Sequence, residues 1–328
     1  MNVATVYQPL VSVVMPVYNA ERFVGDALKS ILNQTYTKFE FIIIDDGSKD
    51  ESLAIIKKYA DPRIRLIALA QNQGIVHALN TGLQTAQGKY IARMDADDVS
   101  MPNRLALQVA FMESHPEVGL LGTQHVAIHG KARLFPTTHN ALVWYMLNAC
   151  PFVHPSVMLR VDVLKQHQLQ YDKAFEYAED LELWTRLSGF TQVANLPQRL
   201  IKYRYHFATH QRHIQTAANL NTQIKTAHLK QLCPMLPPEI MEQLATYFNH
   251  HLKPAYSHQW LKNMLVCFNQ AQQIVASDDF NKACNRALWF HLSSSPKLYI
   301  ALRKELGKLS WVNLKLAQHI WLLMKIWK

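Results

Sequence analysis

Two short segments of almost unbroken apolar sequence, residues 10–17 and 39–44, constrain the fold of this chain more than any other feature. Both are rich in β-branched residues and have the length of a strand. Such runs are typical of strands in a parallel sheet, because helices cover both faces of that sheet and leave no face for polar side chains. The chain is therefore predicted to contain a buried parallel sheet.

Helical periodicity separates and follows these two strands. Apolar residues recur at helical spacing over residues 24–32 and again over residues 53–59. Residues 63–69 and 89–94 predict two further strands, and residues 75–86 between them predict a helix. This alternation of strand and helix predicts an α/β fold with a doubly wound sheet and helices on both faces.

The pattern loosens after the fourth strand. Residues 118–122 and 156–159 predict strands and residues 181–187 predict a helix, which makes the architecture mixed. Beyond these segments the sequence predicts helices alone, interrupted by prolines. We therefore expect a catalytic α/β domain over residues 1–210 and an α-helical C-terminal region over residues 211–328.

Polar side chains follow each of the four predicted parallel strands. The strand ends run into PVYNAE (residues 16–21), DDGS (45–48), NQG (72–74) and RMDADD (93–98). Taken singly, each segment has an ordinary interpretation as a turn or a helix cap. In open α/β sheets, however, ligands bind beyond the carboxyl ends of the strands. Together the four segments predict a binding site at that edge.

The acidic segment that ends at Asp98 is harder to explain as a turn. Three carboxylates within four residues repel one another unless a cation lies between them. Mg²⁺ or Mn²⁺ with oxygen ligands meets that need, and either ion can bind phosphate oxygens and neutralise charge on a departing nucleotide. A divalent metal (Mn²⁺ or Mg²⁺) is therefore the predicted cofactor.

The order and spacing of these four segments resemble the inverting family 2 glycosyltransferases of bacterial cell-surface glycan synthesis, which have the GT-A fold. The resemblance covers roughly residues 10–210. It implies a Rossmann-like nucleotide-diphospho-sugar transferase domain. It also implies the reaction, in which a sugar moves from a nucleotide-sugar donor, a UDP-sugar, to a hydroxyl of a glycan or lipid-linked acceptor.

The resemblance implies roles for individual residues of the four segments. Asp45 would meet the base and ribose of the donor, and Asp97 would bind the metal. The residues expected to bind the nucleotide-sugar are Pro16, Tyr18, Asn19, Glu21, Asp45, Asp46, Asn72, Gly74, Arg93 and Asp95.

Direct displacement of the nucleotide needs a base that deprotonates the acceptor hydroxyl as it attacks the anomeric carbon. Residues 177–184, YAEDLELW, open a predicted helix and are similar to the family's acidic motif, in which the aspartate matching Asp180 is the base. Glu179 is the alternative. Ordinary stabilisation of a helix N-terminus by acidic residues, at about 1 kcal/mol or less, would explain the same pattern if it stood alone.

Four further residues are predicted to lie on the acceptor or phosphate side of the cleft: His154, Trp184, Arg204 and His206. His154 belongs to a His-Pro segment that family members often carry near the acceptor, and a structural histidine is the alternative. Arg204 and His206 are similar to the family's Tyr-Arg-x-His segment near the diphosphate or metal. A guanidinium suits phosphate because its fork donates two hydrogen bonds.

Composition and targeting signals limit the remaining classes. Lys and Arg exceed Asp and Glu by 34 to 24, but the basic residues are spread along the chain without a recognition module, so no nucleic-acid partner is expected. The four cysteines are scattered, and we find neither a secretion signal nor an apolar stretch long enough to span a membrane. A cytoplasmic location is expected.

Two questions stay open on the sequence alone. Apolar residues at helical steps, interspersed with lysines, make residues 309–328 compatible with an interfacial helix on the cytoplasmic face of the membrane. A helix packed on the catalytic domain or in a dimer interface is the alternative, and the oligomeric state is undetermined. The rival function is a noncatalytic nucleotide-sugar-binding or scaffold protein of the same fold, which would lack the base or the metal carboxylate.

Overall fold

The structure of the protein is a computed structural model. It describes residues 9–128, 132–205 and 207–232 together with residues 234, 238–239, 241–242 and 245–246, and within these ranges the side chains of residues 207–215 are not described. Three predictions lie wholly or largely outside the described residues: the role of His206, the interfacial helix at residues 309–328, and the α-helical C-terminal region beyond residue 246.

The chain divides into two compact units. The first comprises Met1–Leu142 and Cys150–Leu220, and the second comprises Val143–Ala149 and Asn221–Lys328. The candidate site lies in the first unit. None of the helices that the structure describes is both long enough and apolar enough to cross a membrane.

The strands and helices of the described residues follow one another in mixed order. The strands are β1 (Val11–Val17), β2 (Phe39–Asp45), β3 (Ile64–Ala68), β4 (Tyr90–Arg93), β5 (Val99–Ser100), β6 (Val118–Ala127), β7 (Met158–Arg160) and β8 (Gln192–Tyr203). The helices are α1 (Val24–Leu32), α2 (Ser52–Lys57), α3 (Ile75–Thr85), α4 (Arg104–Ser114), α5 (His139–Tyr145), α6 (Val161–Gln166), α7 (Glu179–Leu187) and α8 (Phe207–Leu232), with short 3₁₀ helices at His154–Ser156 and Lys173–Phe175.

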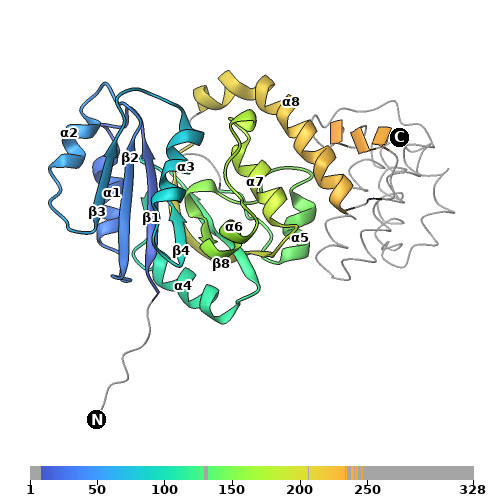
Figure 1. Cartoon of the computed structure of the whole chain (residues 1–328), viewed down its shortest axis with the longest axis horizontal. Helices are drawn as coiled ribbons and strands as arrows, with labels where there is room; N and C mark the ends of the chain where they lie inside the picture. Colours follow the sequence, from blue (N-terminus) through green and yellow to red (C-terminus); the bar gives the residue numbers. More distant parts are fainter. Residues whose placement is uncertain are drawn as a thin grey trace, which may run out of the picture. The chain divides into compact units, whose positions relative to one another are not determined.

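These strands form one sheet in the order β3-β2-β1-β4-β7-β6-β8-β5. The first four strands in that order are parallel, and Figure 1 shows β1, β2 and β3 side by side. β7 is antiparallel to β4 and to β6, and β8 is parallel to β6. The predicted doubly wound α/β sheet is thus confirmed in the parallel half, and the predicted mixed architecture is confirmed in the other half.

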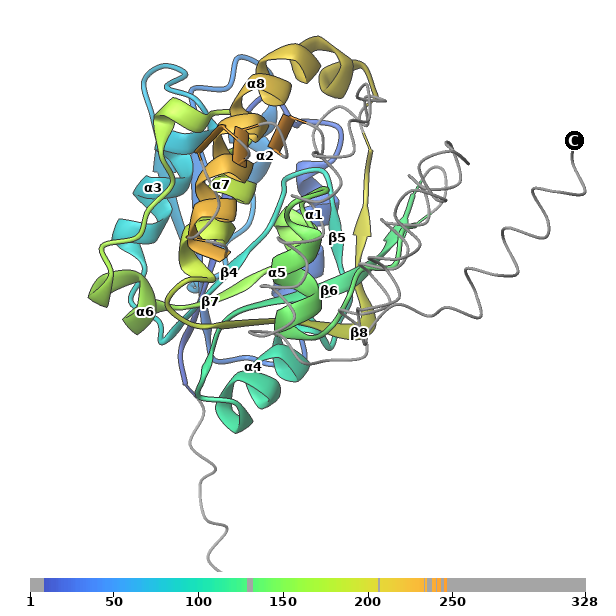
Figure 2. The same ribbon diagram turned by 90° about the vertical axis from the view of Figure 1, so that its right-hand side faces the viewer.

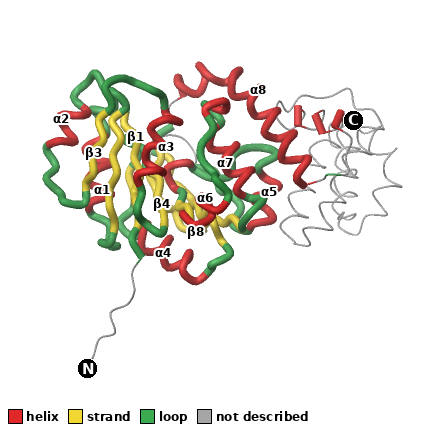
Figure 3. The backbone as a smooth tube through the Cα atoms, viewed as in Figure 1, coloured by secondary structure: helices red, strands yellow, loops and turns green. Residues whose placement is uncertain are grey.

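Helices cover both faces of the parallel half, as the unbroken apolar strands predict. Val13 and Met15 of β1 belong to a buried cluster that also includes Leu28 of α1. On the opposite face, Val14 lies against Gly82 of α3, and Figure 3 shows α1 and α3 in red beside the yellow strands. β1 therefore has no solvent-facing side, which explains why its sequence does not alternate.

The longest described strand, β8, is not predicted by the sequence. It pairs with β6 along its length (Figure 2), but the register shifts where Leu196 faces Thr123 and Arg199 faces Gln124. Pro197 lies in this irregularity and is exposed. Because proline cannot donate to the ladder, it interrupts both the pairing and the apolar pattern by which a strand is recognised.

In the second unit, two buried basic side chains of α8, Lys225 and His228, form hydrogen bonds with backbone carbonyl groups. The Lys225 ammonium donates to the Asn148 carbonyl at 3.1 Å, and His228 Nε2 donates to the Val143 carbonyl at 2.9 Å. Burial lowers the pKa of Lys225 to about 8. These contacts join α8 to the segment Val143–Ala149, the other part of the same unit.

The contact between α3 and the sheet yields a stability prediction. A Cβ added at Gly82 would lie 2.3 Å from Val14 Cγ1, so we expect Gly82→Ala to lower the free energy of unfolding by about 1–3 kcal/mol through overpacking. Gly25 in α1 is the matched control, because its Cβ would meet nothing closer than 3.7 Å. We expect Gly25→Ala to leave stability unchanged or raise it by up to about 1 kcal/mol. Urea denaturation of both variants checks this, and equal midpoints would contradict it.

Candidate active site

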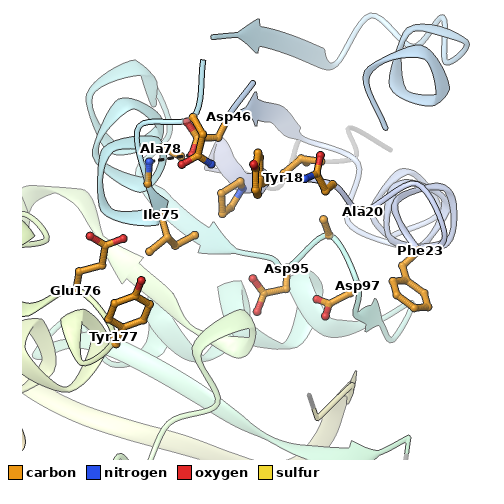
Figure 4. A pocket seen from close by; sticks show the side chains of 16 residues that line it. Tyr18, Ala20, Phe23, Asp46, Ile75, Ala78, Asp95, Asp97, Glu176 and Tyr177 are labelled. Carbon is orange, nitrogen blue, oxygen red and sulfur yellow. Dashed lines mark hydrogen bonds between the residues drawn. The ribbon is translucent and has the colours of Figure 1, made fainter. Parts of the chain in front are cut away.

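A cleft of about 670 Å³ lies at the ends of the parallel strands (Figure 4). It contains residues that follow β1, β2, β3 and β4, as expected for ligand sites in α/β sheets. Its lining residues are Pro16, Val17, Tyr18, Asn19, Ala20, Phe23, Asp46, Asn72, Gly74, Ile75, Ala78, Asp95, Ala96, Asp97, Glu176 and Tyr177. The four predicted strand-end segments therefore meet in one place.

Hydrogen bonds lock the loop after β1 to the loop after β2. Asn19, whose backbone φ is 49°, donates through its amide N–H to Ser48 Oγ at 3.0 Å. The Glu21 amide donates to Asp50 Oδ2 at 3.0 Å, and Glu21 Oε2 accepts from the Glu51 amide at 3.0 Å. Glu21, predicted to bind the nucleotide-sugar, thus joins two loops and does not line the cleft. These hydrogen bonds fix the loop after β1 to the loop after β2 at one wall of the cleft.

The aspartates at the end of β2 have different surroundings. Asp46 accepts hydrogen bonds from the Gln73 and Gly74 amides at 2.8 and 3.0 Å, so its carboxylate shapes the loop before α3. Gly74 has φ 93°, and a Cβ there would lie 3.1 Å from Glu176 Oε1, so glycine is required. Asp45 is 1% exposed, and its Oδ1 has no hydrogen-bond partner among the described residues. Asp45, predicted to bind the nucleotide-sugar, is therefore buried next to the cleft residue Asp46 and does not itself line the cleft.

Carboxylate oxygens of Asp95, Asp97 and Asp98 all lie within 4.8 Å of one another. Burial and the charges of Asp95 and Asp97 raise the pKa of Asp98 to about 9. A bound cation would reverse that effect by favouring the ionised carboxylates. The donors are hard oxygen atoms, which suit Mg²⁺ or Mn²⁺, and Asp97 lies in the wall of the cleft. The cluster therefore fits a divalent cation.

Arg204 is brought to this acidic cluster by the end of β8. Its amide donates to Asp98 Oδ1 at 2.7 Å, and its Nε donates to the Asp97 carbonyl at 3.2 Å. Its guanidinium carbon lies 4.2 Å from the centre of the Phe23 ring, which lines the cleft. Arg204 and Asp97, two residues predicted to belong to the site, are thus in direct contact although they are far apart in the chain.

Arg93 lies beneath the cleft and does not line it. It ends β4, is 5% exposed and forms an ion pair with Asp95. Burial raises the pKa of Glu179 and of Asp180, and the positive charge of Arg93 offsets part of that rise. Arg93 therefore connects the acidic cluster after β4 with the acidic start of α7.

Glu179 and Asp180 lie in the first turn of α7 and do not line the cleft. Glu179 Oε2 accepts from the Tyr177 amide at 2.8 Å, and Asp180 Oδ1 accepts from the Leu181 amide at 2.6 Å. Burial and the charge of Asp180 raise the pKa of Glu179 to about 7, and burial raises the pKa of Asp180. Both carboxyl groups thus have a higher proton affinity than ordinary surface acids, as general bases often do.

His154 is half-buried and packs against the buried side chains of Trp184 and Tyr171. His154 Nε2 shares a hydrogen bond of 2.9 Å with the Tyr171 hydroxyl, and its ring centre lies 5.8 Å from that of Trp184. Burial and the charge of Arg93 hold the pKa of His154 well below its usual range, so the ring is neutral. Trp184 is fully buried, and its Nε1 has no partner among the described residues. Neither residue lines the cleft.

Two cleft residues, Glu176 and Tyr177, were not given a role by the sequence analysis. They reach the cleft because their segment is tied to α3: Asn80 Nδ2 donates to the Tyr171 carbonyl, and Asn80 Oδ1 accepts from the Tyr171 amide, at 2.8 and 3.0 Å. Glu179 also holds the Tyr177 amide, where φ is 78°. Figure 4 shows Glu176 and Tyr177 on one side of the cleft. Residues 171–178, YDKAFEYA, carry no local pattern that sets these two residues apart.

Comparison with known proteins shows similarity to sugar-transferring enzymes. The family model described as "Glycosyl transferase family 2" matches residues 12–166. The putative glycosyltransferase EpsE of Bacillus subtilis is 37% identical over 207 residues, which cover 60% of this chain and 73% of that protein. The amylovoran biosynthesis glycosyltransferase AmsE of Erwinia amylovora is 36% identical over 204 residues, covering 59% and 75%.

Two solved structures share the GT-A fold with this chain. TarS of S. aureus in complex with UDP-GlcNAc has a TM-score of 0.61 at 18% identity, with 90% of this chain and 87% of that chain covered. The mannosyltransferase PcManGT of Pyrobaculum calidifontis in complex with GDP-Man and Mn²⁺ has a TM-score of 0.52 at 18% identity, with 90% and 86% covered. At this identity the likeness shows the fold, which is the fold class predicted from the sequence.

The acidic cluster yields a metal-binding prediction. We expect Mn²⁺ to bind the protein and Asp97→Asn to weaken that binding by about tenfold or more, because one of few charged ligands is lost. Asp26→Asn is the control, since Asp26 is an exposed acid in the first turn of α1. Isothermal titration with MnCl₂ and with MgCl₂ measures the affinities. Equal affinity in the wild type and both variants would contradict a metal site at Asp97.

Proposed function

The chain belongs to glycosyl transferase family 2, and on that premise we propose that it transfers a sugar from a nucleoside-diphosphate sugar to a hydroxyl group of a glycan or lipid-linked acceptor. The observation that carries the proposal is that the polar segments after four parallel strands meet in one cleft, whose lining includes Asp95 and Asp97 of the acidic cluster.

We infer that the donor lies along the cleft with its nucleoside near Tyr18 and Asp45 and its diphosphate near Asp97. A cleft of about 670 Å³ is within the usual size range of small-molecule sites. Tyr18 lines the cleft, is 49% exposed and offers a ring face to the base, and Asp45, which directly precedes the cleft residue Asp46, has a carboxylate oxygen without a hydrogen-bond partner among the described residues. A UDP-sugar is the proposed donor.

A divalent cation held at Asp97, with Asp95 and Asp98 nearby, would stabilise the negative charge that develops on the departing nucleoside diphosphate. Arg204 supports this arrangement, because its backbone and side chain hold Asp98 and the Asp97 carbonyl in place. The protein's own contribution is to preorganise these oxygen atoms before the donor enters.

Asp180 is the proposed catalytic base. Its carboxylate takes the proton of the acceptor hydroxyl while that oxygen forms a bond to the anomeric carbon, and the bond from the anomeric carbon to the diphosphate oxygen breaks with its electron pair. Attack opposite the leaving group inverts the anomeric centre. Glu179 holds the Tyr177 amide and is the alternative base.

Synthesis of a surface polysaccharide is the proposed setting, at the cytoplasmic face of the membrane. It is supported by the relative AmsE, whose name assigns it to amylovoran biosynthesis. Peripheral attachment through residues 309–328 is part of the same proposal and concerns residues that the structure does not describe.

The base assignment predicts a loss of transfer in Asp180→Asn. Because the amide cannot accept the proton, we expect kcat to fall by about 10²–10⁴-fold while donor binding stays within about threefold. Asp162→Asn is the matched control, since Asp162 is an exposed acid in the first turn of α6. Nucleotide release is measured for a panel of UDP-, GDP- and dTDP-sugars with Mn²⁺, Mg²⁺ or EDTA and crude glycan acceptors. Tight nucleotide binding without turnover of any donor would favour a noncatalytic binding protein.

The raised pKa of Asp180 predicts an acid limit to the reaction. The base must be ionised, so kcat/KM is lost as the pH falls through the pKa of that group. Burial raises this pKa, and the midpoint should therefore lie above the ordinary aspartate value of about 4. The pH dependence of kcat/KM with saturating metal measures it. A rate that stays constant down to about pH 4 would contradict Asp180 as the base.

A further inference from the structure

The charged side chains that line the cleft are all acidic. Four carboxylates belong to the lining, those of Asp46, Asp95, Asp97 and Glu176, and the part of it that the structure describes contains no Lys, Arg or His. A nucleotide-sugar carries its own negative charge on the diphosphate. Because like charges at close range cost binding free energy, the diphosphate needs the cation proposed at Asp97, and the remaining acids suit an uncharged part of the ligand.

Three of these four carboxylates already have partners. Asp46 accepts hydrogen bonds from two backbone amides, Asp95 is paired with Arg93, and Asp97 belongs to the candidate metal cluster. For the half-buried Glu176, the described residues supply neither a hydrogen-bond donor nor an ion-pair partner. An ionised carboxylate accepts hydrogen bonds through two oxygens, so it can receive two neighbouring hydroxyl groups. Within the described lining, Glu176 is therefore the acid that can bind a ligand rich in hydroxyl groups.

Contacts on both sides present Glu176 and the next residue, Tyr177, to the cleft. A Cβ at Gly74, the N-cap of α3, would lie 3.1 Å from Glu176 Oε1, so this carboxylate lies close to the start of α3. The Tyr177 amide donates to Glu179 Oε2 at 2.8 Å. Tyr177 has φ 78° and a side chain that is 48% exposed. A non-glycine residue keeps such a backbone conformation where its surroundings hold it, and ligand sites are common places for it.

The two residues lie along the path that the transferred sugar takes in the proposed reaction. In Figure 4, Glu176 and Tyr177 form one side of the cleft, and Asp95 lies between Tyr177 and Asp97 in that view. α7 begins two residues after Tyr177 and carries Asp180. The transferred sugar must lie between the diphosphate at the metal and the base. Glu176 and Tyr177 stand between these two groups, at the wall of the cleft next to the start of α7.

We propose that Glu176 and Tyr177 bind the transferred sugar of the donor and select an uncharged sugar over a uronic acid. The Tyr177 ring packs against C–H groups of the sugar, because the face of an aromatic ring is apolar and electron-rich, and the Glu176 carboxylate accepts hydrogen bonds from the hydroxyl groups. A uronic acid would bring a second carboxylate to Glu176 in a cleft whose described lining has no basic side chain. The inference rests on the proposed function, in which this sugar lies between the metal and the base.

The test measures binding by isothermal titration with Mn²⁺ present, using UDP, UDP-glucose, UDP-galactose, UDP-N-acetylglucosamine and UDP-glucuronic acid. We expect the wild type to bind an uncharged UDP-sugar more tightly than UDP-glucuronic acid. Glu176→Gln removes the charge and keeps the shape, so it should weaken binding of that uncharged UDP-sugar about fivefold and reduce its advantage over UDP-glucuronic acid about tenfold. Affinity for UDP itself should match the wild type, which also shows that the variant is folded. Glu117→Gln is the matched control, since Glu117 is an exposed acid directly before β6.

The aromatic ring is tested in the same titrations. Tyr177→Leu removes the ring face, so it should weaken binding of the preferred UDP-sugar about threefold to tenfold and leave the affinity for UDP unchanged. Tyr177→Phe keeps the ring and should bind like the wild type. Because binding is measured without transfer, neither result depends on which residue is the base.

Other outcomes overturn the inference and leave the proposed function in place. If the variants bind every UDP-sugar like the wild type and only the KM for the acceptor rises, both residues contact the acceptor. If only the midpoint of urea denaturation changes, Glu176 serves the start of α3. Equal losses of affinity for UDP and for the UDP-sugars, or tighter wild-type binding of UDP-glucuronic acid, would also overturn it. A wild type that binds neither UDP nor any UDP-sugar would contradict the proposed donor as well, which distinguishes the two failures.

Discussion

The guanidinium of Arg93 is the charge on which the candidate site depends. It is buried at the end of β4, where an isolated cation would be costly, and Asp95 is its ion-pair partner. The same charge reaches Glu179 and Asp180 of α7. Without it, several carboxyl groups near one another in a poorly solvated place would take up protons. The charge of Arg93 thus partly offsets the effect of burial on the acids after β4 and on those at the start of α7.

The sheet explains how these groups come together. Its parallel half places the ends of β1, β2 and β4 at one edge, and the loops beyond them are locked by hydrogen bonds such as those from Asp46 to the loop before α3. Its mixed half brings β8 alongside β6, which delivers Arg204 to the acidic cluster. Most cleft-lining residues thus follow strands of the regular half, and Arg204, which contacts the acidic cluster, comes from the irregular half.

The resemblance to family 2 enzymes accounted for most of the cleft but did not distinguish lining residues from supporting ones. Tyr18, Asn72 and Asp97 line the cleft as predicted. Arg93 belongs to the same motif as Asp97, yet it does not line the cleft, because β4 is buried along its whole length and Arg93 with it. A motif specifies which residues are near a site, whereas the direction of each side chain depends on the packing around it.

The sequence by itself determined the parallel half of the sheet and the acidic segments at its edge, because strand periodicity and the residues that directly follow a strand are local properties of the chain. Only the tertiary structure decided that Glu176 and Tyr177 join the cleft, that Pro197 interrupts β8 at a register shift, and that Arg204 reaches Asp97 and Asp98. The physical reason is distance along the chain: the Asn80–Tyr171 bonds that position the Glu176 segment join residues 91 positions apart. Contacts of that kind arise when packed elements meet, and no local pattern of residue types specifies them.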